Sequence, residues 1–273
     1  MSTDQEWERW GARDPYFGVL TLPQFRSAAL TAQDKDMFFV SGQHHVDYVM
    51  SACRRFAADF VPLDVLDFGC GVGRLVVPFA ACAQRVVGMD ISPSMLAEAR
   101  RNCDERGTPQ VELVGSDDQL LQAPGLFDLV HSCIVLQHLE LARGRELFRE
   151  LVAKVRPGGM GALHVTYGWD IHDASYGLPP PLPAPQALPP PMPWEPVKTQ
   201  LRQWLRPAPA PAPPPQSPVA TVDADPEMQM NYYNLSELMY LLNRAGVQQV
   251  WTDFTDHGGA LGAFLFFRKP LPV

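Results

Sequence analysis

The 273-residue sequence predicts an α/β fold, a mostly parallel sheet of seven strands with helices on both faces. Three observations support this expectation. Strand and helix patterns alternate from residue 65 to residue 167, a glycine-rich turn follows the first strand, and an acidic residue ends the next one. The carboxyl ends of parallel strands meet at one edge of a sheet, so a ligand site is expected there.

The first strand, Val65–Gly69, leads into glycines at positions 69, 71 and 73 and then into a helix over Gly73–Ala83. Glycines at alternate positions let the backbone turn sharply and approach a ligand closely. Asp67, at the end of the strand, is placed to accept hydrogen bonds from a cationic or hydroxylated group. Asp90 ends the next strand, and an acid about 20 residues after such glycines typically binds a ribose diol. The expected ligand is therefore a nucleoside.

The remaining elements follow from periodicity, caps and turns. Ser92 is expected to cap a helix whose first residue is Pro93. Strands are expected at Arg85–Asp90, Gln110–Val114, Leu126–Cys133, Met160–Tyr167, Val247–Phe254 and Ala260–Phe267, and helices at Pro93–Arg106, Gly144–Val155 and Leu235–Ala245.

The glycine spacing is D-x-G-x-G-x-G, whereas a dinucleotide site requires G-x-G-x-x-G and here has Arg74 in place of the third glycine. The motif resembles that of the class I S-adenosylmethionine-dependent methyltransferases. The resemblance continues in order through Asp90 as the ribose-binding acid, Ser116–Asp118 near adenine, Phe127–Ser132 as the fourth strand and Arg156–Gly159 before the fifth. It implies a Rossmann-like sheet with antiparallel sixth and seventh strands, and S-adenosyl-L-methionine as the cofactor.

The resemblance and the residue pattern together predict the cofactor site. One of the two carboxylates Asp117 and Asp118 should accept the adenine amino group, and the other is expected to be a solvated loop charge. His131, inside the fourth strand, is interpreted as a hydrogen-bonded core residue or a residue at the cofactor's edge. The expected cofactor-binding residues are Asp67, Gly69, Gly71, Gly73, Asp90, Ile91, Asp117, Asp118, His131 and Ser132.

Methyl transfer from a sulfonium requires the nucleophile, carbon and sulfur to be held in line, so no catalytic triad is expected. A base near neutral pKa helps when the acceptor is a hydroxyl or a protonated amine. His138, after the fourth strand, is the catalytic candidate, and the alternative is a structural role at a helix start. His164 is expected in the core. No metal site is expected, because His44 and His45 face different sides of a helix.

Aromatic residues in the first 60 positions predict an N-terminal helical lid over the carboxyl edge of the sheet. The alternative is that these residues only anchor helices on the core. Tyr167, Trp169, Tyr232 and Tyr233 flank the insertion, and their alternative is packing at the seam between the insertion and the sheet. Ser41 and Gly42 are further lid candidates. The substrate-binding candidates are Tyr16, Phe17, His45, Gln137, Tyr167 and Tyr232.

Between residues 179 and 218 lie 17 of the 28 prolines, a density that excludes helix and sheet. Within this insertion, Val197–Leu205 could form a short helix over the active site or a flexible spacer. The expected organisation is a lid at 1–60, the cofactor-binding core at 61–168, the proline-rich insertion at 169–226, and a helix and strand pair at 227–273 that completes the sheet.

The net charge of −8 argues against a nucleic acid substrate and favours a small-molecule acceptor. No apolar run is long enough to span a bilayer, and the polar start is unlike a signal peptide, so a cytoplasmic protein is expected. The five cysteines contain no C-x-x-C pair, which argues against a disulfide framework or zinc site. The oligomeric state stays open.

The leading hypothesis is therefore methylation of a small molecule, a metabolite or natural-product intermediate, at an unspecified atom. Three alternatives remain. The cofactor could serve a reaction other than methyl transfer, or the chain could be a non-catalytic partner protein that keeps the nucleoside site. A nicotinamide dehydrogenase is disfavoured by Arg74.

Overall fold

In a computed structural model of the chain, residues 2–169 and 224–271 are described. The first of the two units into which the chain divides comprises the described residues up to 169 and from 226. The sheet, its helices and the site belong to the first unit. The predicted insertion at 169–226, with its helix candidate Val197–Leu205, lies almost entirely outside the described residues.

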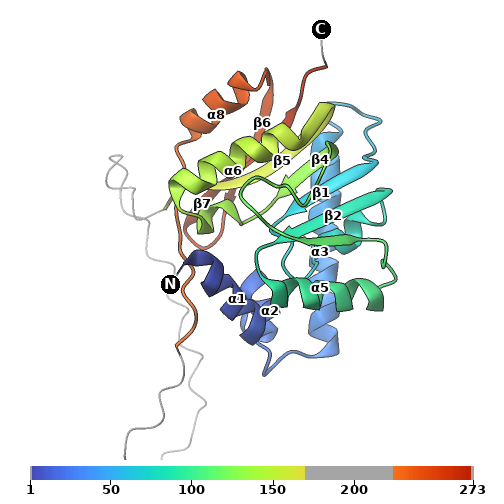
Figure 1. The fold of residues 1–273 in the computed structure, drawn as a ribbon, viewed down its shortest axis with the longest axis vertical. Coiled ribbons are helices and arrows are strands. Elements are labelled where there is room, and N and C mark those ends of the chain that lie inside the picture. Colours follow the sequence, from blue (N-terminus) through green and yellow to red (C-terminus); the bar gives the residue numbers. More distant parts are fainter. Residues whose placement is uncertain (1, 170–223, 272–273) are drawn as a thin grey trace, which may run out of the picture. The chain divides into compact units, whose positions relative to one another are not determined.

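A seven-stranded sheet forms the centre of the first unit (Figure 1). Its order is β3-β2-β1-β4-β5-β7-β6, and its pairs are parallel except for β5 with β7 and β7 with β6. This confirms the predicted fold class, including the antiparallel end pair. The strands are β1 Asp64–Phe68, β2 Arg85–Asp90, β3 Glu112–Gly115, β4 Phe127–Ser132, β5 Val155–Trp169, β6 Val250–Asp256 and β7 Ala260–Arg268.

The strand order reverses between β1 and β4, because the chain winds outward from β1 through β2 to β3 and then returns to β4. Open α/β sheets bind ligands outside the carboxyl ends of the strands at such a switch point. Asp67 of β1 lies opposite Gly88 of β2 on one side and His131 of β4 on the other. The strand register therefore places Asp67 and His131 side by side at the switch point.

Helices cover both faces of the sheet, because alternate strand residues point to opposite sides. Leu66 packs in the core under α6 and α8, whereas its neighbour Val65 packs in the core under α3, α4 and α5. The helices are α3 Ala32–Cys53, α4 Val76–Phe79, α5 Pro93–Glu105, α6 Leu141–Lys154 and α8 Leu235–Arg244, with a 3-10 turn η2 at Leu136–His138.

The N-terminal segment forms α1 Thr3–Arg13, α2 Pro15–Val19 and the 3-10 turn η1 Pro23–Phe25. Ser2 and Gln5 form a capping box that starts α1. The aromatic side chains of the segment share a third core with residues of the glycine-rich turn and of α5. The segment is thus packed on the cofactor-binding core of the sheet.

Several element boundaries differ from the sequence prediction, among them the starts of α4, β5 and β6. The helix after the glycine-rich turn begins at Val76, because Gly73 has a φ of +88° that no helix accepts. β5 begins at Val155, because this residue pairs with Phe127 across an irregularity in the ladder. β6 begins at Val250. In the described part of the chain, no helix combines the length and apolar character that crossing a membrane requires.

Candidate functional site

A cavity of about 610 Å³ lies at the carboxyl edge of the parallel strands. Its size falls within the roughly 300–1,000 Å³ of small-molecule sites. The residue that directly follows each of the first four strands lines it: Gly69 after β1, Ile91 after β2, Ser116 after β3 and Cys133 after β4. The cavity therefore occupies the position expected for the ligand site.

The glycine-rich turn forms one wall of this cavity. Gly69 and Gly71 have φ values of +75° and +53°, in the left-handed region that favours glycine. A Cβ on Gly69 would lie 2.2 Å from Val135 Cγ2, and one on Gly71 would lie 2.6 Å from Val19 Cγ2. The absent side chains thus make room for two valines of the protein itself, where the sequence suggested room for a ligand.

Two backbone amides hold the Asp90 carboxylate, at the end of β2. Oδ2 accepts a hydrogen bond from the Gly71 amide at 2.8 Å, and Oδ1 accepts one from the Ser92 amide at 2.9 Å. Burial raises the pKa of Asp90 to about 6, although these amides oppose the shift. A carboxylate offers about four acceptor positions. The backbone amide of Ile91 adds a third hydrogen bond, and the acceptor position that remains is open to a ligand in the cavity.

The Asp67 carboxylate lines the cavity and is almost completely buried. Its Oδ1 lies 2.7 Å from Nδ1 of His131, which is fully buried. Its Oδ2 is buried and has no hydrogen-bond partner in the described residues. Because an unpaired buried carboxylate oxygen is costly, this atom is available to a donor on a bound ligand.

Sequence reasoning missed Arg74 as a site residue. Arg74 lines the cavity, its Nε is buried without a partner, and its Nη1 lies 3.4 Å from the Ser41 hydroxyl. No carboxylate of the described residues forms an ion pair with it. Burial lowers the pKa of Arg74, but a guanidinium stays charged in proteins. Its position directly after the last glycine of the turn is the signal that could have identified it.

His138, in η2, lines the cavity together with its neighbour Gln137. Nδ1 of His138 donates to the Gln229 carbonyl at 2.8 Å, so in the neutral ring Nε2 carries the lone pair. Burial lowers the pKa of His138 to about 4, which keeps the ring neutral near pH 7. Gln137 is fixed by the Thr166 hydroxyl, which donates to its Oε1 at 2.6 Å.

The two carboxylates predicted near adenine lie elsewhere. Asp117 accepts hydrogen bonds from the backbone amides of Gln119 and Leu121, which closes its own turn. Asp118 forms an ion pair with Arg143 at 2.8 Å. Neither lines the cavity, whereas the preceding residue Ser116 does.

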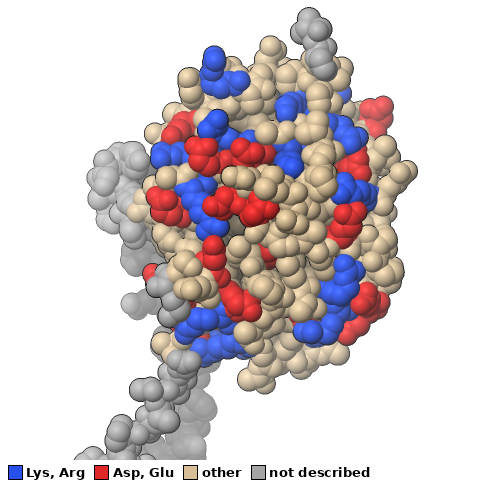
Figure 2. Space-filling view, viewed as in Figure 1, with Lys and Arg blue, Asp and Glu red and all other residues tan. Residues whose placement is uncertain are grey.

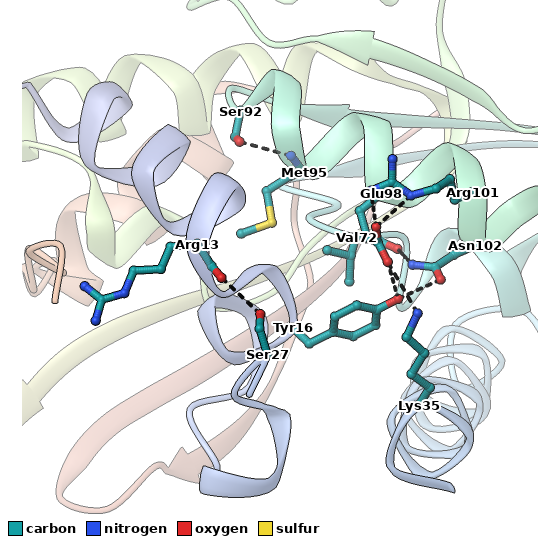
Figure 3. Close-up of polar contacts among 10 residues, drawn as sticks. All are labelled: Arg13, Tyr16, Ser27, Lys35, Val72, Ser92, Met95, Glu98, Arg101 and Asn102. Atoms are coloured by element: carbon teal, nitrogen blue, oxygen red, sulfur yellow. Dashed lines mark hydrogen bonds and ion pairs between the residues drawn. The ribbon is translucent and has the colours of Figure 1, made fainter. Parts of the chain in front are cut away.

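Tyr16 does not line the cavity, and its hydroxyl lies in a polar network between α2 and α5 (Figure 3). Its hydroxyl lies 2.7 Å from both Glu98 Oε1 and Asn102 Oδ1. The Asn102 amide in turn donates to the Val72 carbonyl in the glycine-rich turn at 2.9 Å. Tyr16 therefore connects the N-terminal segment to the turn.

The other predicted site residues fall into two groups. Asp67, Gly69, Gly71, Asp90, Ile91, Gln137 and His138 line the cavity together. Gly73, His131, Ser132, Tyr16, Phe17, His45, Tyr167 and Tyr232 do not line it. The Arg26 guanidinium lies over the Phe17 ring, with its Cζ 3.5 Å from the ring centroid. Tyr167 packs edge-on against Phe254. Tyr232 is exposed.

The cavity's remaining wall is apolar and comes from segments that carry little sequence signal. The stretch from Gly18 to Leu22 contributes from the N-terminal segment, and Met228 and Met230 contribute from the chain before α8. Ile134, directly after β4, lines the cavity with a φ of +57°, which is rare for a β-branched residue and marks local strain. Sequence reasoning missed these residues.

The family model described as "Methyltransferase domain" matches residues 65–159. This stretch holds β1 to β4, the glycine-rich turn and Asp90. Residues 65–159 are therefore similar to a methyltransferase domain. The family resemblance drawn from the sequence is thereby confirmed for this stretch, and the solved structures extend the likeness of fold.

Curated relatives match the methyltransferase domain over part of their length. The ubiquinone biosynthesis O-methyltransferase of Methylobacterium sp. (strain 4-46) is 32% identical over 116 residues, 40% of this chain and 46% of that protein. The ribosomal protein L11 methyltransferase of Geobacter metallireducens is 41% identical over 97 residues, 35% of this chain and 30% of that protein. The chain thus spans less than half the length of these relatives.

Two solved structures share the fold over most of the chain. Magnesium protoporphyrin IX methyltransferase (ChlM) from Synechocystis PCC 6803 with bound SAM has a TM-score of 0.56 at 17% identity, covering 98% of both chains. The N-methyltransferase NodS from Bradyrhizobium japonicum WM9 in complex with S-adenosyl-l-homocysteine has a TM-score of 0.55 at 14% identity, covering 99% of this chain and 100% of that one. At these identities the likeness shows the fold.

Proposed function

We propose that the chain is an S-adenosyl-L-methionine-dependent methyltransferase that acts on a small molecule. One observation carries the proposal. Asp67 and Arg74 have opposite charges, line the same cavity and each keep a buried polar atom without a partner. An α-amino acid group, with its ammonium and carboxylate, satisfies both. Asp90, at the end of β2 with an acceptor position left, suits the ribose hydroxyls of the same ligand.

These residues assign each part of the cofactor a partner. Asp67 accepts from the ammonium, Arg74 donates to the carboxylate, and Asp90 accepts from the ribose. Ser116 and Ile91 line the cavity at the ends of β3 and β2, next to the expected adenine position. When bound, the cofactor supplies an electrophilic methyl group on a sulfonium. The assignment is supported by the structures of ChlM with bound SAM and of NodS in complex with S-adenosyl-l-homocysteine, which share the fold.

The protein's own contribution is to orient the acceptor and to take up its proton. His138 is neutral, and its Nε2 carries the lone pair because Nδ1 donates to a carbonyl. It accepts the proton from an acceptor hydroxyl or ammonium, which contributes about 10²- to 10⁴-fold in typical enzymes. Gln137, held by Thr166, supplies a second polar contact beside it. Proximity supplies the rest of the acceleration.

The acceptor is a small molecule with a largely apolar body. Trp7, Leu20, Leu147 and Met230 line the same cavity as His138, and such walls favour apolar ligands. Acidic and basic side chains alternate on the face of the molecule seen in Figure 2. Nucleic acid binding needs clustered basic residues instead. The two named curated relatives act on different kinds of substrate, so the acceptor class here is inferred from the cavity.

Calorimetric titration with three ligands tests the cofactor assignment. S-adenosylhomocysteine carries both charged groups, its decarboxylated analogue lacks the carboxylate, and NAD tests the dehydrogenase alternative. The chain is expected to bind S-adenosylhomocysteine, to bind the decarboxylated analogue more weakly and to bind NAD negligibly. Arg74→Gln should weaken S-adenosylhomocysteine about 10- to 100-fold, from the roughly 1.5–3 kcal/mol of a charged hydrogen bond, and should leave the analogue unchanged. Absence of S-adenosylhomocysteine binding refutes the proposal.

Product analysis tests the reaction itself. Incubation with S-adenosylmethionine and a panel of apolar phenols and amines should yield S-adenosylhomocysteine together with a methylated product. Methylthioadenosine as the product would instead indicate displacement at another carbon of the sulfonium. Cofactor binding without turnover of any acceptor would favour a non-catalytic partner protein.

A further inference from the structure

A row of three side chains runs from the cavity into the core between β1, β4 and α3. Asp67 Oδ1 lies 2.7 Å from His131 Nδ1, and His131 Nε2 lies 3.0 Å from Nε2 of His45. Asp67 and His131 come from neighbouring strands, whereas His45 comes from the helix that covers them. The row joins the floor of the cavity to α3.

The direction of the first hydrogen bond in the row follows from the chemistry of Asp67. An ionised carboxylate accepts and does not donate, so the proton lies on Nδ1 of His131. The other nitrogen, Nε2, shares a hydrogen bond with Nε2 of His45, in which one ring donates and the other accepts. Burial lowers the pKa of His45 to about 2, so His45 is neutral. Each contact in the row thus has one donor and one acceptor.

One carboxylate oxygen of Asp67, Oδ2, forms no hydrogen bond within the row. Oδ1 is held by His131, whereas Oδ2 is buried, has no partner among the described residues and belongs to a residue that lines the cavity. A carboxylate on its own rotates about its Cβ–Cγ bond, and the bond to His131 removes that freedom. Oδ2 of Asp67 is therefore already oriented before a ligand donor binds. Less side-chain conformational entropy is then lost on binding.

The aromatic surroundings hold the two imidazoles in place. His131 stacks on Phe264 at 5.9 Å between ring centroids, and Phe79 meets its ring edge-on at 5.4 Å. His45 packs on Phe264 at 5.6 Å. Phe264 itself is buried in β7. With its rings fixed by packing, the row has little freedom apart from its hydrogen bonds.

We infer that His131 and His45 are positioning residues for the cofactor, which act through Asp67 to orient its Oδ2 toward the α-ammonium of the amino acid group. This inference rests on the proposed function. It differs from the sequence-based assignment of His131 to direct cofactor contact and of His45 to the substrate, because neither side chain lines the cavity.

A pair of ligands separates positioning from a general structural role. S-adenosylhomocysteine has the α-ammonium, whereas 5′-methylthioadenosine lacks the whole amino acid group but keeps the nucleoside. In His131→Gln the donor next to Asp67 is lost, and the dissociation constant for S-adenosylhomocysteine should rise about tenfold, as expected for one charged hydrogen bond. The constant for 5′-methylthioadenosine should change less than about threefold, within the usual effect of a distant substitution.

A matched substitution checks the direction of the hydrogen bond. In His131→Asn the side-chain amide lies close to the place of Nδ1, so it can still donate to Asp67. This variant should recover most of the S-adenosylhomocysteine affinity that His131→Gln loses. Equal losses for both ligands in both variants would show that His131 serves packing alone and would overturn the inference.

Variants of His45 keep the test decisive if His131 proves essential for folding. His45 is partly exposed, so its substitutions disturb the core less. His45→Leu should weaken S-adenosylhomocysteine relative to 5′-methylthioadenosine, and His45→Gln, whose amide can replace Nε2 in this hydrogen bond, should restore it. No difference between the ligands in His45→Leu overturns the role of His45. If the unmodified chain binds neither ligand, the proposed function fails before this inference is reached.

Discussion

The buried carboxyl of Asp90 predicts that cofactor affinity depends on pH. Burial raises the pKa of this carboxyl from its ordinary value of 3.8 to about 6 in the folded chain. The ribose hydroxyls donate hydrogen bonds, so they bind best when the carboxylate is ionised. Cofactor affinity should therefore be fully present above pH 7 and should decrease as pH falls through about 6.

The magnitude follows from the titration. If the bound carboxylate stays ionised, each pH unit below the pKa of the free protein costs about tenfold in affinity, or about 1.4 kcal/mol. Between pH 7.5 and pH 5 the dissociation constant for S-adenosylhomocysteine should therefore rise about tenfold. The two amide hydrogen bonds from Gly71 and Ser92 keep the carboxylate in place over this range.

Titration calorimetry at several pH values measures this change directly. Asp90→Asn is the control, because it cannot ionise. It should bind more weakly at pH 7.5, by about 1.5–3 kcal/mol, and its affinity should vary little with pH. A flat profile in the unmodified chain, or an equally steep one in Asp90→Asn, would refute the assignment of this carboxylate to the ribose.

The raised pKa of Asp90 also affects the free energy of unfolding, and this effect changes with pH in the opposite direction to the cofactor affinity. A carboxyl whose pKa is higher in the folded than in the unfolded state binds its proton more tightly when folded. Between about pH 4 and pH 6, the contribution of Asp90 to the free energy of unfolding therefore decreases as pH rises. Urea unfolding across this window should show less of that decrease in Asp90→Asn, and an identical pH dependence in the variant would contradict the raised pKa.

Three further changes test the packing and the chemistry. Gly42→Ala should lower the free energy of unfolding by more than about 1 kcal/mol, because its Cβ would lie 2.2 Å from the Arg74 carbonyl oxygen. Gly115→Ala is the control, because its Cβ would meet open space. Urea unfolding should show the loss in the first variant and not in the second. Tyr16→Phe should lower the free energy of unfolding by about 1–3 kcal/mol in thermal melts, and an unchanged melting temperature would contradict the network. His138→Ala should lower kcat about 10²- to 10⁴-fold with little change in S-adenosylhomocysteine affinity, and an unchanged kcat would exclude it as the base.

The sheet and the cofactor end of the site could be predicted because their determinants are local. Alternating strand and helix patterns specify the layers, and the residues after consecutive parallel strands must meet at one edge. Asp67 and Asp90 were therefore predicted to lie in the site, and both line the cavity. The register then brings His131 beside Asp67, which the sequence pattern alone could not reveal because it depends on which strands are neighbours.

The acceptor end could not be predicted, because its residues come from segments whose position depends on tertiary packing. Met228 lies more than 200 residues from Trp7 in the sequence, yet both line the cavity. The predicted candidates Tyr16 and Tyr232 are aromatic and lie in the expected segments, but one is held in a polar network and the other is exposed. Residue type marks such positions as important without showing which way the side chain points.

The N-terminal segment supports the cofactor turn as well as covering it. Val19 fills the space that the absent side chain of Gly71 leaves, and Tyr16 reaches the Val72 carbonyl through Asn102. Both contacts act on the stretch of backbone whose amide at Gly71 fixes the Asp90 carboxylate. Because the turn, Asp90 and the N-terminal segment hold one another, a substitution in the segment is expected to affect the proposed cofactor site without touching the ligand. The N-terminal segment therefore both lines the cavity and stabilises the glycine-rich turn.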